Sequence, residues 1–260
     1  MAYLNMEKNT TIQKKGSPAR QFVRKVWRWA KKIFIILFIA QFIYIILLKW
    51  INPPITITQL VSWVSGYGLK RDYISASNMS PQAKLAVMAS EDQLFPDHSG
   101  FDWKSIKKAM DYNKKKPGRI RGGSTISQQV AKNVFLWQGR SWIRKGLEMY
   151  FTFMIEKIWG KKRILEVYLN VIEMGKGIFG IERAANLYFN KPASQLTRQE
   201  ASMIAACLPN PKKYTVKPVS SHVLFRSKSV QRQMNNLQGD EDIQQLMRTA
   251  PILKNSKKLK

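Results

Sequence analysis

The stretch GGSTISQQVAKN, residues 122–133, decides how the rest of the chain is organised. Its two glycines allow a tight turn in which the backbone approaches a ligand closely. Ser124 or Thr125 is then a good N-cap for a helix. Ser124, Gln128 and Lys132 recur at every fourth position and would share one face of that helix, while the apolar residues between them form a core face.

Two interpretations of this stretch stay open. A glycine turn that leads into a helix offers free backbone amides and the positive end of the helix dipole, which suit a phosphate, and Lys132 adds a full positive charge. The alternative is an ordinary capped helix with a solvated polar stripe. The Walker spacing G-x-x-x-x-G-K-[ST] is absent, so this is not a nucleotide-binding loop of that kind.

Composition narrows the function classes only partly. The chain has 260 residues, 45% of them hydrophobic, and a formal net charge of +28. Such an excess favours polyanionic partners: nucleic acid, anionic lipid headgroups or phosphorylated substrates. The single cysteine, Cys207, excludes an internal disulfide and lies in an apolar run, where a buried, inert thiol is expected. With only two histidines besides, a structural zinc site is not expected.

An apolar run, IFIILFIAQFIYIILL at residues 33–48, follows a basic segment. Trp27 and Trp29 precede the run and Trp50 follows it, as in the aromatic belts at the two faces of a bilayer. We expect a basic cytoplasmic tail at residues 1–32 and a transmembrane helix at 33–50, with the rest of the chain outside. A cleaved signal peptide is the main alternative, but no small-residue cleavage site follows the run. A buried hairpin helix is the other.

The remaining sequence predicts a mainly α-helical domain. Residues 51–78 form a membrane-proximal linker, and residues 79–237 contain helical patterns without a convincing alternating strand. Residues 238–260 are expected to be a basic C-terminal tail. The helical segments are predicted from residue 80, at 141–159, 162–170, 182–189, 194–208 and 223–237.

Two charged groups stand out within this domain. Glu91 lies beside Leu94 and Phe95 at a predicted helix end, where burial would raise its pKa and allow it to accept a proton. The alternative is that Glu91 and its neighbour Asp92 are solvated acids. The second group is Arg144 and Glu148, for which a plain ion pair between adjacent turns on a helix surface is the default interpretation.

Four motifs in series resemble those of one known family. They read E-D-x-x-F-x-x-H-x-G-x-D from residue 91, G-G-S-T-I-x-Q-Q-x-x-K-N from 122, R-x-x-x-R-K-x-x-E from 140 and K-x-x-I-L-E-x-Y-L-N from 161. In order and spacing they resemble the peptidoglycan glycosyltransferases of glycosyltransferase family 51. The resemblance covers roughly residues 70–235. With one N-terminal anchor and no room for a transpeptidase domain, the chain resembles the monofunctional biosynthetic type.

This resemblance implies a fold and a reaction. The fold would be a lysozyme-like helical glycosyltransferase domain with a membrane-embedded jaw. The substrate would be lipid II, polymerised into β-1,4 glycan strands with inversion and with release of undecaprenyl diphosphate. The growing chain would be the donor and the 4-hydroxyl of the incoming lipid II sugar the acceptor. The enzyme would lie in the bacterial cytoplasmic (inner) membrane, in contact with the bilayer and with other cell-wall synthesis and division proteins.

The resemblance also implies residue roles. Glu91 would be the general base, and Glu148 the second essential glutamate, near the donor. The cations that hold the donor diphosphate would be Lys132, Arg140 and Lys145. Further polar residues would line the same cleft: Ser124, Thr125, Gln128, Gln129 and Asn133. Three residues would complete the first motif in partly structural roles: Asp92, Phe95 and His98. No cofactor is required by the sequence; a divalent cation, Mg²⁺ or Mn²⁺, at the diphosphate is left open.

Two other functions compete with this one. A lysozyme-like hydrolase or lytic transglycosylase also uses a glutamate in a helical fold, but it would not need cations beside the second glutamate. A membrane-anchored nucleic-acid-binding protein would use the charge of +28. It lacks a recognisable reading motif, and a membrane accounts for much of the charge. We therefore expect no nucleic acid among the partners.

Overall fold

A computed structural model describes residues 18–116, 122–139 and 141–248. Arg140, most of the basic loop that precedes Gly122, and the ends of the expected N- and C-terminal tails lie outside these described residues. The chain divides into two units, Met1–Tyr44 and Ile45–Lys260.

The first unit consists of most of helix α1 (Pro18–Leu47). Among the described residues this is the one helix long and apolar enough to cross a membrane, by length and composition. The helix begins well before residue 33, so residues 18–32 of the expected basic tail are helical. Lys31 and Lys32 each lie over a tryptophan ring one turn back, as expected for cationic and aromatic side chains near a bilayer surface.

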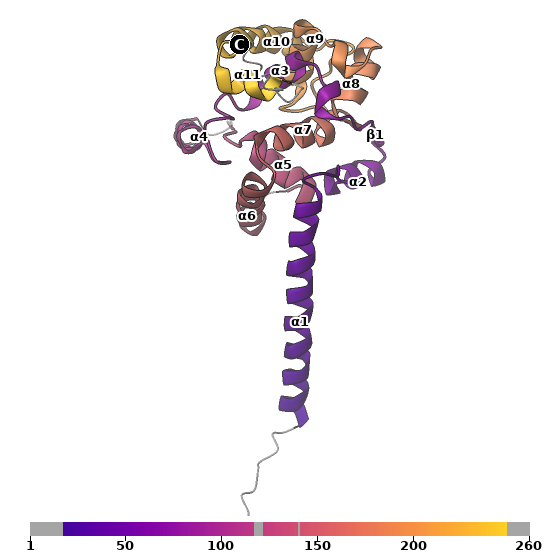
Figure 1. The fold of residues 1–260 in the computed structure, drawn as a ribbon, viewed down its shortest axis with the longest axis vertical. Coiled ribbons are helices and arrows are strands. Elements are labelled where there is room, and N and C mark those ends of the chain that lie inside the picture. The colour runs from indigo at the N-terminus through magenta and orange to yellow at the C-terminus, as the bar shows by residue number, and fades with distance from the viewer. Residues whose placement is uncertain (1–17, 117–121, 140, 249–260) are drawn as a thin grey trace, which may run out of the picture. The chain divides into compact units, whose positions relative to one another are not determined.

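The second unit is mainly helical, as the sequence predicts. Its helices are α2 (Ile57–Val64), α3 (Pro81–Glu91), α4 (Trp103–Lys115), α5 (Ile126–Phe135), α6 (Trp142–Ile158), α7 (Lys161–Val171), α8 (Ile181–Phe189), α9 (Arg198–Cys207), α10 (Ser221–Leu237) and α11 (Glu241–Met247), with two short 3₁₀ turns, η1 (Ala76–Asn78) and η2 (Ala193–Gln195). Figure 1 shows α3 and α8–α11 gathered at one end of this unit and α5, α6 and α7 at the other.

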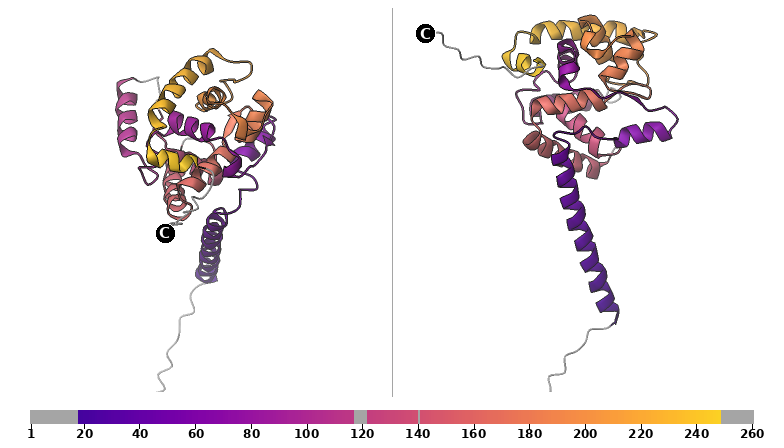
Figure 2. Two further views of the ribbon diagram at one scale, coloured as in Figure 1. Left: turned by 45° about the horizontal axis from the view of Figure 1, so that its top comes forward. Right: turned by 45° about the vertical axis from the view of Figure 1, so that its right-hand side comes forward.

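Helix α3 is the centre of the first group. Ser80 caps it by accepting a hydrogen bond from Gln82 N, and Pro81 occupies the first helical position. Seven consecutive residues from Ala83 to Ala89 are buried, because α9, α10 and α11 pack around the helix. Figure 2 shows α3 enclosed between α10 and α11. The C-terminal end of this enclosed helix is Glu91.

Helix α5 is the centre of the second group and packs against α6, α7 and α2. Its core face is formed by Ile126 and Val130, both fully buried. The prediction of a capped helix is confirmed, with Thr125 rather than Ser124 as the N-cap. Ser124 lies before the helix and is exposed, so it does not share a helix face with Gln128 and Lys132.

Helices α2 and α6 have their polar residues inside. In α6 the polar row Arg144, Glu148 and Thr152 is buried, while Trp142 is 92% exposed and Ile143 is 76% exposed. The sequence favoured a solvated surface position for Arg144 and Glu148, and their burial contradicts this prediction. In α2 the buried residues are likewise polar, and Trp63 and Val64 are exposed. This is the reverse of the usual arrangement in a globular protein.

Three short strands were not predicted. They are β1 (Lys70–Arg71), β2 (Glu173–Gly175) and β3 (Ile178–Phe179), in the order β1-β3-β2, with β1 parallel and β2 antiparallel to β3. They are too short to show a period of two in sequence. The strands pair the segment after α2 with the hairpin between α7 and α8.

Three helices were also missed. Helix α2 lies in the expected linker, α4 lies between the first two motifs, and α11 lies in the expected C-terminal tail. Helix α11 belongs to the domain, because Ile243 and Leu246 are buried and the helix packs against α3. Helix α9 begins at Arg198 with Thr197 and Glu200 as a capping box, four residues later than predicted.

Candidate active site

Glu91 lies at the C-terminal end of α3, where groups from several helices meet. Its Oε2 accepts a hydrogen bond of 3.1 Å from Gln129 Nε2 of α5, and its Oε1 lies 3.1 Å from Ser90 Oγ. Burial raises the pKa of Glu91, and the bonds from Gln129 and Ser90 and the charge of Arg226 oppose that rise. The pKa of this carboxyl group is therefore above that of a solvated glutamate, so its ionised form accepts a proton more readily.

Tyr168 of α7 fixes the amide of Gln129. Its hydroxyl donates a hydrogen bond of 3.1 Å to Gln129 Oε1, which leaves the NH₂ group of the same amide to face Glu91. The ring of Tyr168 is fully buried, and burial raises the pKa of its hydroxyl well above the ordinary value, so it stays a donor. Three helices thus set the position of one carboxylate.

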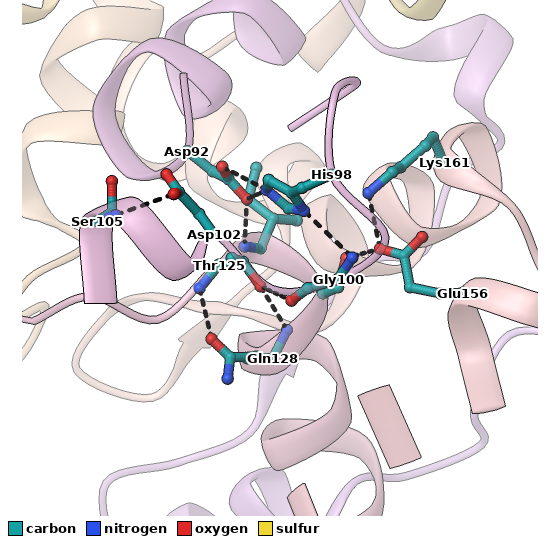
Figure 3. Close-up of polar contacts among 11 residues, drawn as sticks. Asp92, His98, Gly100, Asp102, Ser105, Thr125, Gln128, Glu156 and Lys161 are labelled. Atoms are coloured by element: carbon teal, nitrogen blue, oxygen red, sulfur yellow. Dashed lines mark hydrogen bonds and ion pairs between the residues drawn. The ribbon is translucent and has the colours of Figure 1, made fainter. Parts of the chain in front are cut away.

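Asp92 has a different role from its neighbour. Its Oδ2 accepts a hydrogen bond of 3.0 Å from Ile126 N, the first helical amide of α5, and its Oδ1 lies 3.0 Å from His98 Nε2 (Figure 3). A carboxylate at a helix N-terminus is stabilised by the dipole and by the unsatisfied amides. The helix terminus that the sequence offered as a phosphate site therefore already holds an internal anion. Asp92 and His98 join the first motif to the second.

The cap of α5 uses two further residues that were expected in the cleft. Thr125 Oγ1 donates to Gly100 O at 2.7 Å, and Gln128 Oε1 accepts from Thr125 N at 3.0 Å (Figure 3). Both side chains are buried. Gly100 has φ of +89°, and a Cβ there would lie 2.7 Å from Thr152 Cγ2. Thr125, Gln128 and Gly100 therefore hold the two motifs in register, and the expected contact of Thr125 and Gln128 with a substrate stays a prediction.

Glu156 and Lys161 are parts of the site that the sequence analysis missed. Glu156 Oε1 accepts hydrogen bonds from Ser127 Oγ and from Lys161 Nζ, the latter at 2.7 Å. Lys161 Nζ, which faces Glu156 in Figure 3, also lies 4.5 Å from the ring centroid of the fully buried Phe95. This cation–π contact and the ion pair fix Phe95 of the first motif beneath α6 and α7.

Glu148 is the second predicted glutamate and is buried, with 3% of its side chain exposed. Arg144 Nη1 donates to its Oε2 at 2.7 Å, and Lys145 Nζ donates to its Oε1. The ion pair of Arg144 and Glu148 exists, but it is buried rather than on the helix surface. Arg144 Nε is also buried and has no partner among the described residues. Two cations, Arg144 and Lys145, therefore neutralise the buried carboxylate of Glu148.

Lys132 lies within electrostatic range of both Glu91 and Glu148. It follows Gln129 by one turn on α5 and is partly buried. Burial lowers its pKa, the charge of Glu148 and more weakly that of Glu91 raise it, and Arg144 and Lys145 lower it. Because all four charges act on Lys132, the second and third motifs and Glu91 form one electrostatic unit.

The other predicted residues are placed as follows. Asn133 accepts at its Oδ1 from Thr58 Oγ1 and Gln138 Nε2 and donates from its Nδ2 to Gln129 O, so it ties α5 to α2. Ser124 is exposed before the cap. Arg140 lies outside the described residues, and its expected contact with the diphosphate stays a prediction. Among the described residues, no group of three or more His, Cys, Asp or Glu side chains comes together to hold a metal ion.

Comparison with known proteins is consistent with this geometry. Residues 58–235 match a family model described as transglycosylase. The chain belongs to this transglycosylase family. A biosynthetic peptidoglycan transglycosylase of Yersinia pseudotuberculosis is 46% identical over 233 residues, which cover 87% of this chain and 97% of that protein. One from Yersinia pestis is 45% identical over the same lengths. The transglycosylase described here is thus an enzyme of the glycosyltransferase class, and the resemblance noted in the sequence is confirmed at the level of the family.

Proposed function

We propose that this transglycosylase polymerises lipid II into β-1,4 glycan strands, with Glu91 as the general base. The observation that carries this proposal is the position of Glu91. Burial raises the pKa of its carboxylate, which accepts a hydrogen bond from Gln129. Gln129 lies on α5, and the same helix carries Lys132 one turn later. A proton acceptor and a cation are thus set at a fixed spacing.

The proposed step is a single displacement. Glu91 takes the proton from the 4-hydroxyl of the acceptor sugar as that oxygen forms a bond to the anomeric carbon of the donor. The bond between this carbon and the diphosphate oxygen breaks, and undecaprenyl diphosphate leaves with the electron pair. Attack from the side opposite the leaving group inverts the anomeric configuration and gives the β-linkage.

The leaving diphosphate needs positive charge where negative charge develops. Lys132 and Lys145 supply it in the described part of the chain. Glu148 holds Lys145 and Arg144 in one place, because it accepts a hydrogen bond from each. In this proposal Glu148 acts on the donor by positioning cations, and its own charge offsets part of theirs. Arg140 would add a further cation.

A lipid-linked substrate also explains the reversed polarity of α2 and α6. Trp63, Val64, Trp142 and Ile143 are exposed apolar side chains on helices whose inner faces are polar. Apolar surface of this kind is suited to the acyl boundary of a bilayer. Together with α1 as a single-pass anchor, they would place the enzyme on the outer face of the bacterial inner membrane, with its N-terminus in the cytoplasm.

The competing functions fit the site less well. A glycan hydrolase must admit water, and it has no use for three cations around a buried second glutamate. A nucleic-acid-binding protein has no use for a base with a raised pKa beside a buried tyrosine. The cell-wall partners expected from the sequence would act on this enzyme from outside the site.

The decisive experiment is polymerisation of fluorescent lipid II by the full chain in detergent, with and without a chelator, and with Mg²⁺ or Mn²⁺ restored. We expect a ladder of polymer that a muramidase digests. Glu91→Gln should abolish the ladder. The matched control is Glu173→Gln, since burial also raises the pKa of Glu173, which lies on β2 and whose carboxylate faces Gly177 N and Lys212. Polymer of wild-type yield from Glu91→Gln would refute the base, and cleavage without synthesis would favour the hydrolase.

A further inference from the structure

Arg226 of α10 reaches the end of the helix that carries Glu91. Its Nη2 donates a hydrogen bond of 3.4 Å to Ser90 O, a carbonyl in the last turn of α3. A cation at a helix C-terminus is favourable because it faces the negative end of the dipole. Residues 90 and 226 lie far apart in sequence, and none of the four motifs contains Arg226.

The contacts of Arg226 are poor for a purely structural residue. Its one hydrogen bond to the described chain is long, and its Nε is buried without a partner. Leaving a buried donor without a partner is unfavourable. An arginine whose task was to hold helices together would be expected to satisfy this donor. What the position does supply is a positive charge beside Glu91.

We propose that Arg226 is a positioning residue of the transfer reaction, whose guanidinium places a permanent positive charge at the end of α3, next to the residue that precedes Glu91. This inference rests on the proposed role of Glu91. In the proposed reaction Arg226 contacts neither the sugar nor the diphosphate. It acts only through the carboxylate of Glu91.

The other groups around Glu91 cannot take this role. Asp92, beside it in sequence, is an acid that raises the pKa of Glu91. Tyr168 of α7 and Cys207 of α9 are buried and uncharged, the pKa of Cys207 being raised to about 12. Ser90 and Gln129 contribute hydrogen bonds but no charge.

Lys132 of α5 and His222, one turn before Arg226 on α10, are titratable. Burial lowers the pKa of both. The guanidinium of Arg226 keeps its charge throughout the working range of pH. Arg226 is therefore the cation near Glu91 whose charge does not vary with pH, and it opposes the effect of burial on this carboxyl.

The test is the pH profile of kcat/KM for lipid II polymerisation by the full chain, because its acid limb reports the essential base of the free enzyme. Arg226→Gln keeps a donor for Ser90 O but removes the charge. We expect its acid limb to move up by roughly 1 pH unit, with rates above the limb returning to within about threefold of wild type. Arg226→Lys keeps the charge and should restore most of the shift. Arg232→Met, an exposed position on the same helix, is the control and should change nothing.

The outcomes separate this inference from the function on which it rests. An acid limb that stays in place in Arg226→Gln, with activity reduced equally at every pH, would overturn the role of Arg226 and leave a packing role. Thermal unfolding of each variant shows whether it is folded. If Arg226→Gln is not folded, the acid limb of Arg226→Lys is compared with that of the wild type instead. Full activity of Glu91→Gln would instead refute the base itself.

Discussion

The side-chain amide of Gln129 donates a hydrogen bond of 3.1 Å to Glu91 Oε2. Through this bond the end of α3 is attached to α5, the helix that carries Lys132 on its next turn. One hydrogen bond and one turn of α5 therefore separate Glu91, the proposed base, from Lys132, the proposed diphosphate cation. Changes to this connection should affect transfer more than they affect folding.

Tyr168→Phe tests the connection without touching Glu91. The variant loses the donor to Gln129 Oε1, so the amide is free to turn its NH₂ away from the carboxylate. We expect polymerisation to fall about tenfold and stability to fall by about 1 kcal/mol. The control is Tyr188→Phe, which loses a buried bond to Met174 O away from Glu91. It should lose similar stability and keep its activity; equal activity losses in the two variants would contradict the connection.

The stability of the protein should depend on Glu91 in a predictable direction. Burial raises its pKa, so the folded state binds this proton more tightly than the unfolded state. The stabilisation is present below the unfolded pKa and is lost as pH rises through the folded pKa. Glu91→Gln should therefore raise Tm by about 2–4 °C at neutral pH. Calorimetry near pH 4 should find the difference gone, and a variant less stable than wild type at pH 7 would contradict this.

Lys132 variants should impair use of the donor. Lys132→Met removes the charge opposite the leaving diphosphate, and we expect kcat to fall about 100-fold. Lys132→Arg should recover part of the rate. Because burial lowers the pKa of Lys132, activity should also decline on the alkaline side at a lower pH than an ordinary lysine would give. Lys157→Met, at an exposed position of α6, is the control. Normal rates in Lys132→Met would remove Lys132 from the site.

Removing one member of the ion pair between Glu156 and Lys161 should destabilise the protein more than removing both members. The exposed fractions of the two side chains are 8% and 18%. Glu156→Gln leaves the lysine uncompensated and should cost about 3 kcal/mol, whereas the double variant Glu156→Gln/Lys161→Met should recover part of the loss. Denaturant unfolding gives both values. Asp72→Asn breaks the exposed pair with Arg183 and should change stability by less than about 0.5 kcal/mol. Additive losses would show that the two residues are not coupled.

The sequence predicted most of the helices and the elements that carry the four motifs, because caps and apolar periodicity are local signals. Thr125 as a cap follows from its immediate neighbours in sequence. The packing that buries Glu91 and raises its pKa does not, and neither does the orientation of α6. Periodicity shows which residues share a face, but it does not show whether that face meets a protein core, water or lipid.

Long-range partners were also beyond the sequence. Arg226 meets Ser90, 136 positions away, only because α10 packs against α3. The internal partner of the α5 terminus was not predicted for the same reason, and the phosphate interpretation stays a prediction. Asp92 is 34 positions away from Ile126, and nothing local shows that its carboxylate occupies the first amide.

The enclosure of α3 by α9, α10 and α11 sets an order of events during synthesis. The ribosome makes the base first and its surroundings last, since these three helices end the described chain. Until they emerge, the end of α3 lacks the three helices that enclose it. We therefore expect a polypeptide that ends before α9 to be inactive in lipid II polymerisation, even though it already contains every one of the four motifs.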